Sequence, residues 1–347
     1  MPVLKIGLVG LGRIGRNLFR ILHGREDIDL AVVADPTPAD QLEYLLRFDT
    51  LLGRFPDALS VKDGWIYAGG RRTRLIDAPN PPHAIDVKWG EHGVDVVIEA
   101  AHAPRGRVEL EGYLAAGAKR VVLCTPPREA PDLTVVMGVN DRALEPRHRI
   151  VSNASCTAHA AALVLQLLDR EFGVERALLT TVHAYTDEQR LADVPAEDLR
   201  RGRAAAENII PQETRTAEVL DQLLPEIAGK VTAMSLNVPV ANGSVVDLVS
   251  WHRQDVTVEA INEVVRTAAF GPLRRYLAFE DQPIVSSDVL RSPFSGTFDA
   301  QATMVVGKRV AKTLTWFDNG WAYALRAVEL CERLAAFGDW KPGEAGR

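Results

Sequence analysis

Short apolar runs alternate with a helix-periodic segment at the start of the chain. Residues 5–10 form an apolar run, a glycine-rich turn follows, and residues 16–23 carry apolar side chains at helical spacing. Residues 30–35 form a second apolar run. A strand, a helix and a strand within about thirty residues predict a βαβ unit with a parallel sheet. Residues 95–99 and 120–124 predict further parallel strands, whereas short alternations over 60–87 predict antiparallel edge structure.

The pattern changes beyond residue 155. An apolar helix over 160–168 is followed by strand-like runs with helices between them, at 177–182, 231–240, 244–251, 302–306 and 313–317. Such an order predicts a mixed, largely antiparallel α+β region. The segment 184–208 is long, polar and charged, and a loop of this length is usually functional or held by a partner subunit.

Composition narrows the class of protein. A chain of 347 residues with 47% hydrophobic and 25% charged residues predicts two globular domains. The net charge of −6 gives no basic footprint for nucleic acid, and no apolar run reaches the length of a membrane span. Three cysteines are too few for a disulfide framework, and an apolar strand begins too early for a secretory leader. We therefore expect a cytoplasmic protein that binds neither nucleic acid nor membrane. No His, Cys, Asp or Glu set has zinc-like spacing, so no metal is expected.

The glycine-rich turn carries a nucleotide motif. Residues 10–15 read Gly-Leu-Gly-Arg-Ile-Gly and fit G-x-G-x-x-G between a strand and a helix. The glycines permit a tight turn, backbone approach to a pyrophosphate and close packing of the helix. Asp35 ends the second strand, where a carboxylate accepts from ribose hydroxyls and repels a 2′-phosphate, which favours NAD over NADP. The alternative is a tight turn without a ligand.

Cys156 is the candidate nucleophile. It follows the turn-forming residues Ser-Asn-Ala-Ser at 152–155 and opens an apolar helix, whose dipole is predicted to lower the pKa of the thiol. His183 closes a predicted strand further along the chain, from which its imidazole could reach the sulfur as base and later as acid. Spacing alone leaves open a buried structural cysteine and an unrelated histidine.

Several ordered motifs resemble the phosphorylating glyceraldehyde-3-phosphate dehydrogenase family over nearly the whole chain. They are Ser-Asn-Ala-Ser-Cys-Thr at 152–157, Thr-Val-His-Ala-Tyr-Thr at 181–186, the arginine-rich segment 198–206, Val-Ser-Ser-Asp at 285–288 and Trp-Phe-Asp-Asn at 316–319. The resemblance implies a Rossmann dinucleotide-binding domain over 1–155, completed by the C-terminal helix 320–347. It also implies an α+β catalytic domain over 156–319 with a mostly antiparallel sheet.

The resemblance also implies a chemistry. The Cys156 thiolate attacks an aldehyde, His183 takes the proton as hydride passes to NAD, and inorganic phosphate resolves the thioester. Cofactor contacts are expected from the turn, from Asp35 and from three positions matched by resemblance, the full set being Gly10, Gly12, Arg13, Ile14, Gly15, Asp35, Thr125, Asn319 and Tyr323. The family implies a homotetramer with the loop 184–208 lying against a neighbour's cofactor site.

The residues at the family's phosphate-binding positions match the family only in part. Polar or basic residues match at Ser155, Thr157, Thr186, Arg201 and Thr214. Asn237 stands where the family has arginine, and Arg215 stands where it usually has glycine. A hydrogen bond to a charged group contributes about 1.5–3 kcal/mol, so losing this arginine costs roughly ten- to a hundredfold in phosphate affinity. Arg215 restores the charge from another direction or is a solvated surface residue.

These departures indicate a divergent member that oxidises a small phosphorylated aldehyde. The segment 213–215, Glu-Thr-Arg, is similar to Asp-Thr-Lys of the erythrose-4-phosphate dehydrogenase branch. One alternative is therefore erythrose 4-phosphate oxidation in which water resolves the thioester. The second alternative is a non-catalytic paralogue that binds NAD, and the replacement of the family's Glu-Ser-Thr-Gly by Glu-Ala-Ala-His at 99–102 motivates it.

Overall fold

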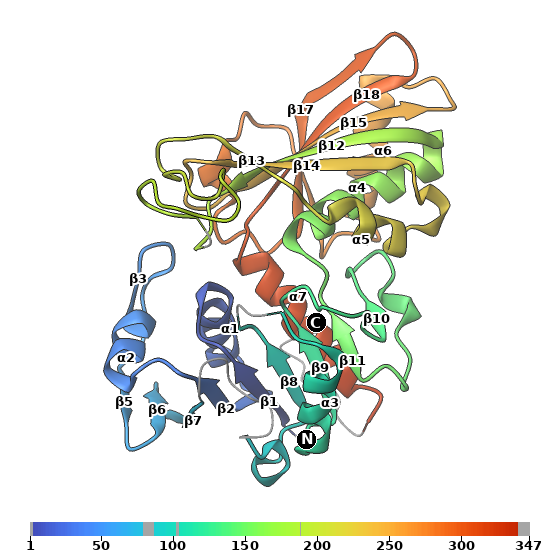
Figure 1. The fold of residues 1–347 in the computed structure, drawn as a ribbon. Coiled ribbons are helices and arrows are strands. Elements are labelled where there is room, and N and C mark those ends of the chain that lie inside the picture. The colour runs from blue at the N-terminus through green and yellow to red at the C-terminus, as the bar shows by residue number, and fades with distance from the viewer. Residues whose placement is uncertain (1–2, 79–86, 102–103, 188, 339–347) are drawn as a thin grey trace. The chain divides into compact units, whose positions relative to one another are not determined.

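A computed structural model describes residues 3–78, 87–101, 104–187 and 189–338. The chain divides into two compact units. The first comprises Met1–Val135, Ala143–Ala154 and Ala324–Arg347, and the second comprises Val136–Arg142 and Ser155–Tyr323. Each unit is built around one large sheet (Figure 1).

The first unit contains a nine-stranded sheet. Its order is β10 (Leu133–Thr134), β11 (Ile150–Ser152), β9 (Arg120–Leu123), β8 (Val96–Glu99), β1 (Leu4–Val9), β2 (Ile28–Asp35), β7 (Arg71–Asp77), β6 (Trp65–Ala68) and β5 (Leu59–Lys62). Neighbours from β10 to β7 pair in parallel, and β6 and β5 add an antiparallel edge. The parallel strands are nearly continuous apolar runs because both faces of such a sheet are buried.

The helices of this unit are α1 (Arg13–His23), α2 (Ala39–Arg47), α3 (Arg107–Ala115) and the part of α7 (Trp321–Ala335) that follows Tyr323. A short hairpin, β3 (Phe48–Asp49) and β4 (Gly53–Arg54), follows α2. The pattern of apolar positions did not predict α2, because only Leu42 and Leu46 of this helix are buried.

The second unit contains a seven-stranded sheet. Its order is β13 (Ile210–Gln212), β14 (Val231–Val238), β12 (Val174–Ala184), β15 (Ser244–His252), β18 (Val310–Phe317), β17 (Gly296–Val306) and β16 (Leu277–Glu280). Two pairs are parallel, β12 with β14 and β16 with β17, and the others are antiparallel. Helices α4 (Cys156–Phe172), α5 (Thr216–Leu223) and α6 (Val258–Phe270) cover one face (Figure 1). The predicted fold class is confirmed.

Two elements extend beyond the apolar runs that predicted them. Helix α4 begins at Cys156, as predicted for the candidate nucleophile, and not at residue 160 where the apolar run begins, because the Ser155 side chain accepts the N–H of Ala158 and caps the helix. Strand β17 begins at Gly296 rather than at 302, because a break in register between Asp299 and Met304 interrupts the alternation. The long loop is as predicted: among its described residues, only an isolated bridge between Arg190 and Ala204 interrupts the stretch from β12 to β13.

Candidate active site

The glycine turn joins β1 to α1 in the first unit. Gly10 has φ +89°, and a Cβ there would lie 2.8 Å from the backbone of Ala101. A Cβ on Gly15 would lie 2.0 Å from the Gly10 carbonyl oxygen. These two glycines are therefore required by internal packing. A Cβ on Gly12, in contrast, would meet no atom within 4 Å.

The open space at Gly12 lies at the N-terminus of α1. Gly12 is the N-cap, no side chain caps the helix, and its first turn contains no acidic residue. The first N–H groups of a helix have no intrahelical partner and carry partial positive charge. Arg13 and Ile14 belong to this turn and are partly buried. The turn can therefore hold a pyrophosphate, whose oxygens would accept hydrogen bonds from these N–H groups.

Asp35 lies at the carboxyl end of β2 and is 6% exposed. One carboxylate oxygen accepts the N–H of Leu11 at 2.6 Å, and the other accepts the N–H of Thr37 at 2.8 Å. The side chain thus ties β2 to the glycine turn, and each oxygen keeps a lone pair for a ribose hydroxyl. Thr125 follows β9 at the same edge of the parallel sheet and is partly buried.

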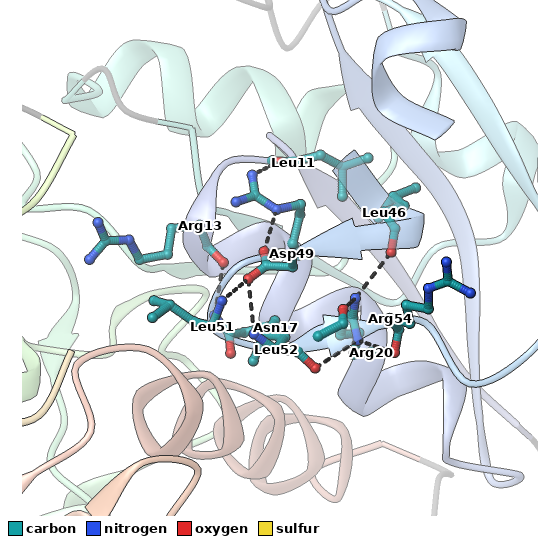
Figure 2. A network of polar contacts seen from close by, with 11 residues as sticks. Leu11, Arg13, Asn17, Arg20, Leu46, Asp49, Leu51, Leu52 and Arg54 are labelled. Carbon is teal, nitrogen blue, oxygen red and sulfur yellow. Dashed lines mark hydrogen bonds and ion pairs between the residues drawn. The ribbon is translucent and has the colours of Figure 1, made fainter. Parts of the chain in front are cut away.

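Arg16 connects the glycine turn to the β3–β4 hairpin. Its Nε donates to Asp49 at 3.0 Å, and its Nη1 donates to the Leu11 carbonyl at 3.2 Å. Asp49 also accepts the N–H groups of Leu51 and Leu52, as Figure 2 shows. Burial by itself would raise the pKa of Asp49, but these N–H donors and the Arg16 guanidinium outweigh it and hold the pKa below its usual value. The Asp49 carboxylate is therefore charged at neutral pH and fixes the hairpin beside the turn.

Cys156 and His183 meet in the second unit. Cys156 is the first residue of α4, and His183 is the next-to-last residue of β12. The Cys156 Sγ atom lies 3.7 Å from His183 Nε2. The alternative of an unrelated cysteine and histidine therefore does not hold. His183 Nδ1 lies 2.6 Å from the Ala184 carbonyl, which can only accept, so Nδ1 carries the proton and Nε2 is the nitrogen that can accept one from sulfur.

Burial raises the pKa of the Cys156 thiol to about 11, even though part of the residue remains accessible. The N–H groups of Thr157 and Cys156 and the Thr157 hydroxyl oppose this shift, and the Asp318 carboxylate adds to it. The lowered pKa predicted from the helix N-terminus alone is therefore wrong. The thiol is therefore mostly protonated at neutral pH, and His183 Nε2 is the nearby group that can accept its proton.

Asn319 and Tyr323 lie in the same unit. The Asn319 amide nitrogen is 3.4 Å from His183 Nε2 and 3.3 Å from Nδ1, which places Asn319 beside the base. The Tyr323 ring packs edge-on against the buried His159 ring at a centroid distance of 6.0 Å. Sequence reasoning missed Ser244, whose hydroxyl contacts both Asn319 and the Ala184 backbone. No local pattern marks this serine, because its partners are 60 and 75 residues away.

Three polar residues matched to the phosphate sites lie close to these elements. Ser155 caps α4, and Thr157 is buried in its first turn with its hydroxyl directed to the Cys156 sulfur. Thr186 follows β12, where its N–H and its hydroxyl both approach Gln189 Oε1, at 2.6 and 3.3 Å. The Gln189 amide nitrogen is buried without a hydrogen-bond partner among the described residues.

The two candidate arginines point to carboxylates on the surface. Arg215 donates to Glu218 at 2.9 Å, and its side chain is 69% exposed. Arg201 lies in the long loop, pairs with Asp198 at 3.3 Å and is 44% exposed. Thr214 shares a hydrogen bond with Thr216 at 2.8 Å. In this arrangement Arg215 is a surface residue with its own counterion.

Asn237 lies directly beside the catalytic pair. It occupies β14 opposite His183 of β12 in the parallel register, so the two side chains share one face of the sheet. Asn237 is 6% exposed. A neutral amide thus occupies the buried position nearest to His183 on the neighbouring strand.

These features define a class of enzyme: a dehydrogenase that binds a dinucleotide and uses a cysteine as covalent nucleophile. Comparison with known proteins identifies the family. The profile described as "Glyceraldehyde 3-phosphate dehydrogenase, NAD binding domain" matches residues 4–105, and that described as "Glyceraldehyde 3-phosphate dehydrogenase, C-terminal domain" matches residues 155–319. The chain belongs to the glyceraldehyde-3-phosphate dehydrogenase family.

Individual members of this family align with the chain over nearly their whole length. The chain is 40% identical to glyceraldehyde-3-phosphate dehydrogenase of Geobacillus stearothermophilus over 336 residues, which is 96% of this chain and 99% of the relative. It is 41% identical to the Streptomyces coelicolor enzyme over 330 residues, covering 94% and 97%. It is 39% identical to glyceraldehyde-3-phosphate dehydrogenase 2 of Bacillus subtilis over 334 residues, covering 96% and 97%.

The NAD-binding profile identifies NAD as the cofactor, in agreement with the turn at Gly10–Gly15 and with Asp35. Among the described residues, three or more His, Cys, Asp or Glu side chains nowhere gather in a way that could hold a metal ion. In the same residues, no helix combines the length and apolar character needed to cross a membrane. His102, one of the departures from the family pattern, lies outside the described residues.

Proposed function

We propose that this protein oxidises glyceraldehyde 3-phosphate, or a phosphorylated aldehyde close to it, with NAD, and that inorganic phosphate resolves a thioester on Cys156. The observation that carries the proposal is the contact of 3.7 Å between Cys156 Sγ and His183 Nε2 at the N-terminus of α4. The family membership supplies the substrate class.

The reaction begins with proton transfer from sulfur to His183. The Nδ1 hydrogen bond to Ala184 fixes the tautomer that can accept this proton at Nε2. The Cys156 thiolate then attacks the aldehyde carbon, and the carbonyl oxygen becomes an oxyanion. The N–H of Cys156, at the start of α4, and the imidazolium both stabilise this charge. Return of the proton from His183 gives a neutral thiohemiacetal.

Oxidation converts the thiohemiacetal to a thioester. NAD, when bound, supplies the acceptor for the hydride that leaves the former aldehyde carbon. His183 takes the hydroxyl proton as the carbonyl forms. A phosphate oxygen then attacks the acyl carbon, the C–S bond breaks, and the Cys156 thiolate leaves with the acyl phosphate as product. The hydroxyls of Ser155 and Thr157, at the start of α4, are the donors we assign to anions near the sulfur, and Thr186 can add a donor when its hydroxyl leaves Gln189.

Omission of phosphate tests the resolving step. With purified protein, NAD and glyceraldehyde 3-phosphate, we expect a burst of about one NADH per active Cys156 and then a stall, because the thioester persists. Addition of phosphate should restore steady turnover. Steady turnover without phosphate would contradict the phosphorylating reaction and favour hydrolysis by water. Absence of NADH with any aldehyde would contradict the enzymatic role altogether.

The neutral side chain at Asn237 favours a second candidate, an erythrose-4-phosphate dehydrogenase-type oxidation with water as resolving nucleophile. Asn237 brings no charge to the buried position beside His183, and Arg215 and Arg201 are paired with Glu218 and Asp198. A phosphate placed at Asn237 would lack a counterion there. Erythrose 4-phosphate is therefore the second aldehyde to be assayed.

The substitution Asn237→Arg is expected to increase the preference for phosphorylated over unphosphorylated substrate. The ratio of kcat/KM for glyceraldehyde 3-phosphate to that for glyceraldehyde should rise about ten- to a hundredfold, since a charged hydrogen bond contributes about 1.5–3 kcal/mol. The Asn237→Gln variant adds length without charge and should leave the ratio unchanged. An unchanged ratio in Asn237→Arg would mean that the substrate phosphate binds elsewhere.

We further propose a homotetramer located in the cytoplasm. Leu178, on an internal strand of the second unit's sheet, is 52% exposed, and Met234 on β14 is 44% exposed. Helices cover one face of this sheet, and such apolar side chains on the other face suit a subunit contact. The exposed Leu191 and Leu199 of the long loop support the same assembly. Light scattering of the purified protein measures the oligomeric state.

A further inference from the structure

The amide of Asn319 faces the imidazole of His183 with its nitrogen. This nitrogen is nearly equidistant from the two ring nitrogens, at 3.3 Å from Nδ1 and 3.4 Å from Nε2. Both distances are within hydrogen-bonding range, so the amide N–H groups lie against the imidazole nitrogens. Nε2 also lies 3.7 Å from the Cys156 sulfur. The positive end of the amide dipole thus lies against the base.

Ser244 fixes which end of this amide faces the ring. Its Oγ accepts the N–H of Ala184 at 2.9 Å and lies 2.7 Å from Asn319 Oδ1. Since Oδ1 can only accept, the Ser244 hydroxyl donates to it. If the amide turned over, the Ser244 hydroxyl would lose its acceptor in a site that is 1% exposed. An unsatisfied buried donor costs about 1–3 kcal/mol, which holds the observed orientation.

We propose that Ser244 is a positioning residue that holds His183 neutral before substrate binds, by orienting Asn319. The inference rests on the proposed function only in giving His183 the role of base. An amide N–H group against the ring nitrogens disfavours a second proton on the imidazole, whereas an amide oxygen there would favour it. Through this serine, the backbone at Ala184 fixes both the tautomer and the electrostatic environment of His183.

Among the described residues, three further uncharged groups lie near His183. They are the Cys156 thiol of α4, Asn237 at the paired position of β14, and the Phe317 ring of β18, which packs edge-on at 6.1 Å. The charged group of this region is Asp318. Its oxygens accept four hydrogen bonds, from the Asn242 amide and from the N–H groups of Arg291, Gly320 and Trp321.

The test measures alkylation of Cys156 by iodoacetamide in the full-length protein without cofactor. Mass spectrometry of the Cys156 peptide gives the rate between pH 5 and pH 10. In the Ser244→Ala variant the Asn319 amide can turn its oxygen to the ring and stabilise the imidazolium. The apparent pKa of Cys156 should therefore fall by about one unit, and alkylation at pH 7 should be about tenfold faster than in the wild type.

Ser250→Ala is a matched control. Ser250 lies on the same strand, is fully buried, and shares a hydrogen bond of 2.8 Å with His252 instead of contacting His183. This variant loses an equivalent buried hydroxyl and should keep the wild-type alkylation profile. An unshifted profile in Ser244→Ala, or an equal shift in Ser250→Ala, would overturn the proposal.

A second variant covers the case in which Ser244→Ala does not fold. Asn319→Leu removes the amide dipole. It should shift the pH profile of Cys156 alkylation to lower pH by about half the shift expected for Ser244→Ala. A wild-type profile in this variant would also overturn the proposal. Alkylation requires no catalytic turnover, so it tests the role of Ser244 separately from the proposed function. If the Ser244→Ala profile shifts but the wild-type protein forms no NADH, the proposed function is contradicted and the role of Ser244 is supported.

Discussion

Replacing Cys156 with serine is expected to lower kcat for NADH formation on the order of 10⁴-fold, about 5.5 kcal/mol of transition-state stabilisation. The thiolate forms the covalent bond in both half-reactions, and a serine hydroxyl is far harder to ionise beside His183 at 3.7 Å. Stopped-flow absorbance at saturating NAD and aldehyde measures the loss. NAD binding should be retained, because the glycine turn and Asp35 belong to the other unit.

Cys124→Ser is the matched control for this substitution. Cys124 is a partly exposed thiol of the first unit, and the mechanism gives it no role. Its replacement should leave kcat within about twofold of wild type, as for most substitutions away from a reacting group. A Cys156→Ser variant with full activity would refute the thioester mechanism, and an inactive Cys124→Ser variant would show that a second thiol takes part.

The His183→Asn variant is expected to lose roughly 10²–10⁴-fold in kcat, the usual contribution of a general base. Asparagine can retain a hydrogen bond to the Ala184 carbonyl but cannot take a proton from sulfur. Since burial raises the pKa of Cys156 to about 11, the isolated thiol stays neutral near pH 7. Its alkylation by iodoacetamide should then rise with pH up to about pH 11, whereas wild-type alkylation should begin at lower pH.

Comparison of the two profiles separates the roles of His183. Equal profiles with reduced kcat would mean that His183 acts only in the later proton transfers. Equal profiles with unchanged kcat would contradict its role as base. A shifted profile with reduced kcat would support proton transfer from sulfur to Nε2 before the attack on the aldehyde.

Most of the secondary structure, the glycine turn and the helix start at Cys156 could be predicted from local signals. The strand, the turn at Gly10–Gly15, helix α1 and Asp35 lie within about thirty residues, so the sequence pattern alone predicts a nucleotide site there. Cys156 was predicted at a helix start because it follows the turn-forming residues 152–155 and precedes an apolar helical run, and the Ser155 cap confirms this start. The start of β17 was missed because a register break hides the alternation.

Local sequence signals could not predict the partners of the candidate arginines or the pKa of the Cys156 thiol. Arg215 and Arg201 match positions near an anion site, yet each pairs with a nearby carboxylate on the surface. The pKa of Cys156 depends on burial that no local pattern reports, and burial outweighs the N–H groups of α4. Both outcomes depend on which side chains pack together and which remain in solvent.

The sequence by itself determined the fold class, the nucleotide turn and the helix start at Cys156, because each depends on neighbours along the chain. Only the tertiary structure decided that His183 Nε2 approaches Cys156 Sγ, that Asn237 lies beside the base, and that Ser244 contacts Asn319. These contacts join strands β12, β14 and β15 with the first residue of α4 and with Asn319, which follows β18. Their geometry depends on sheet pairing and core packing between residues that are far apart in sequence.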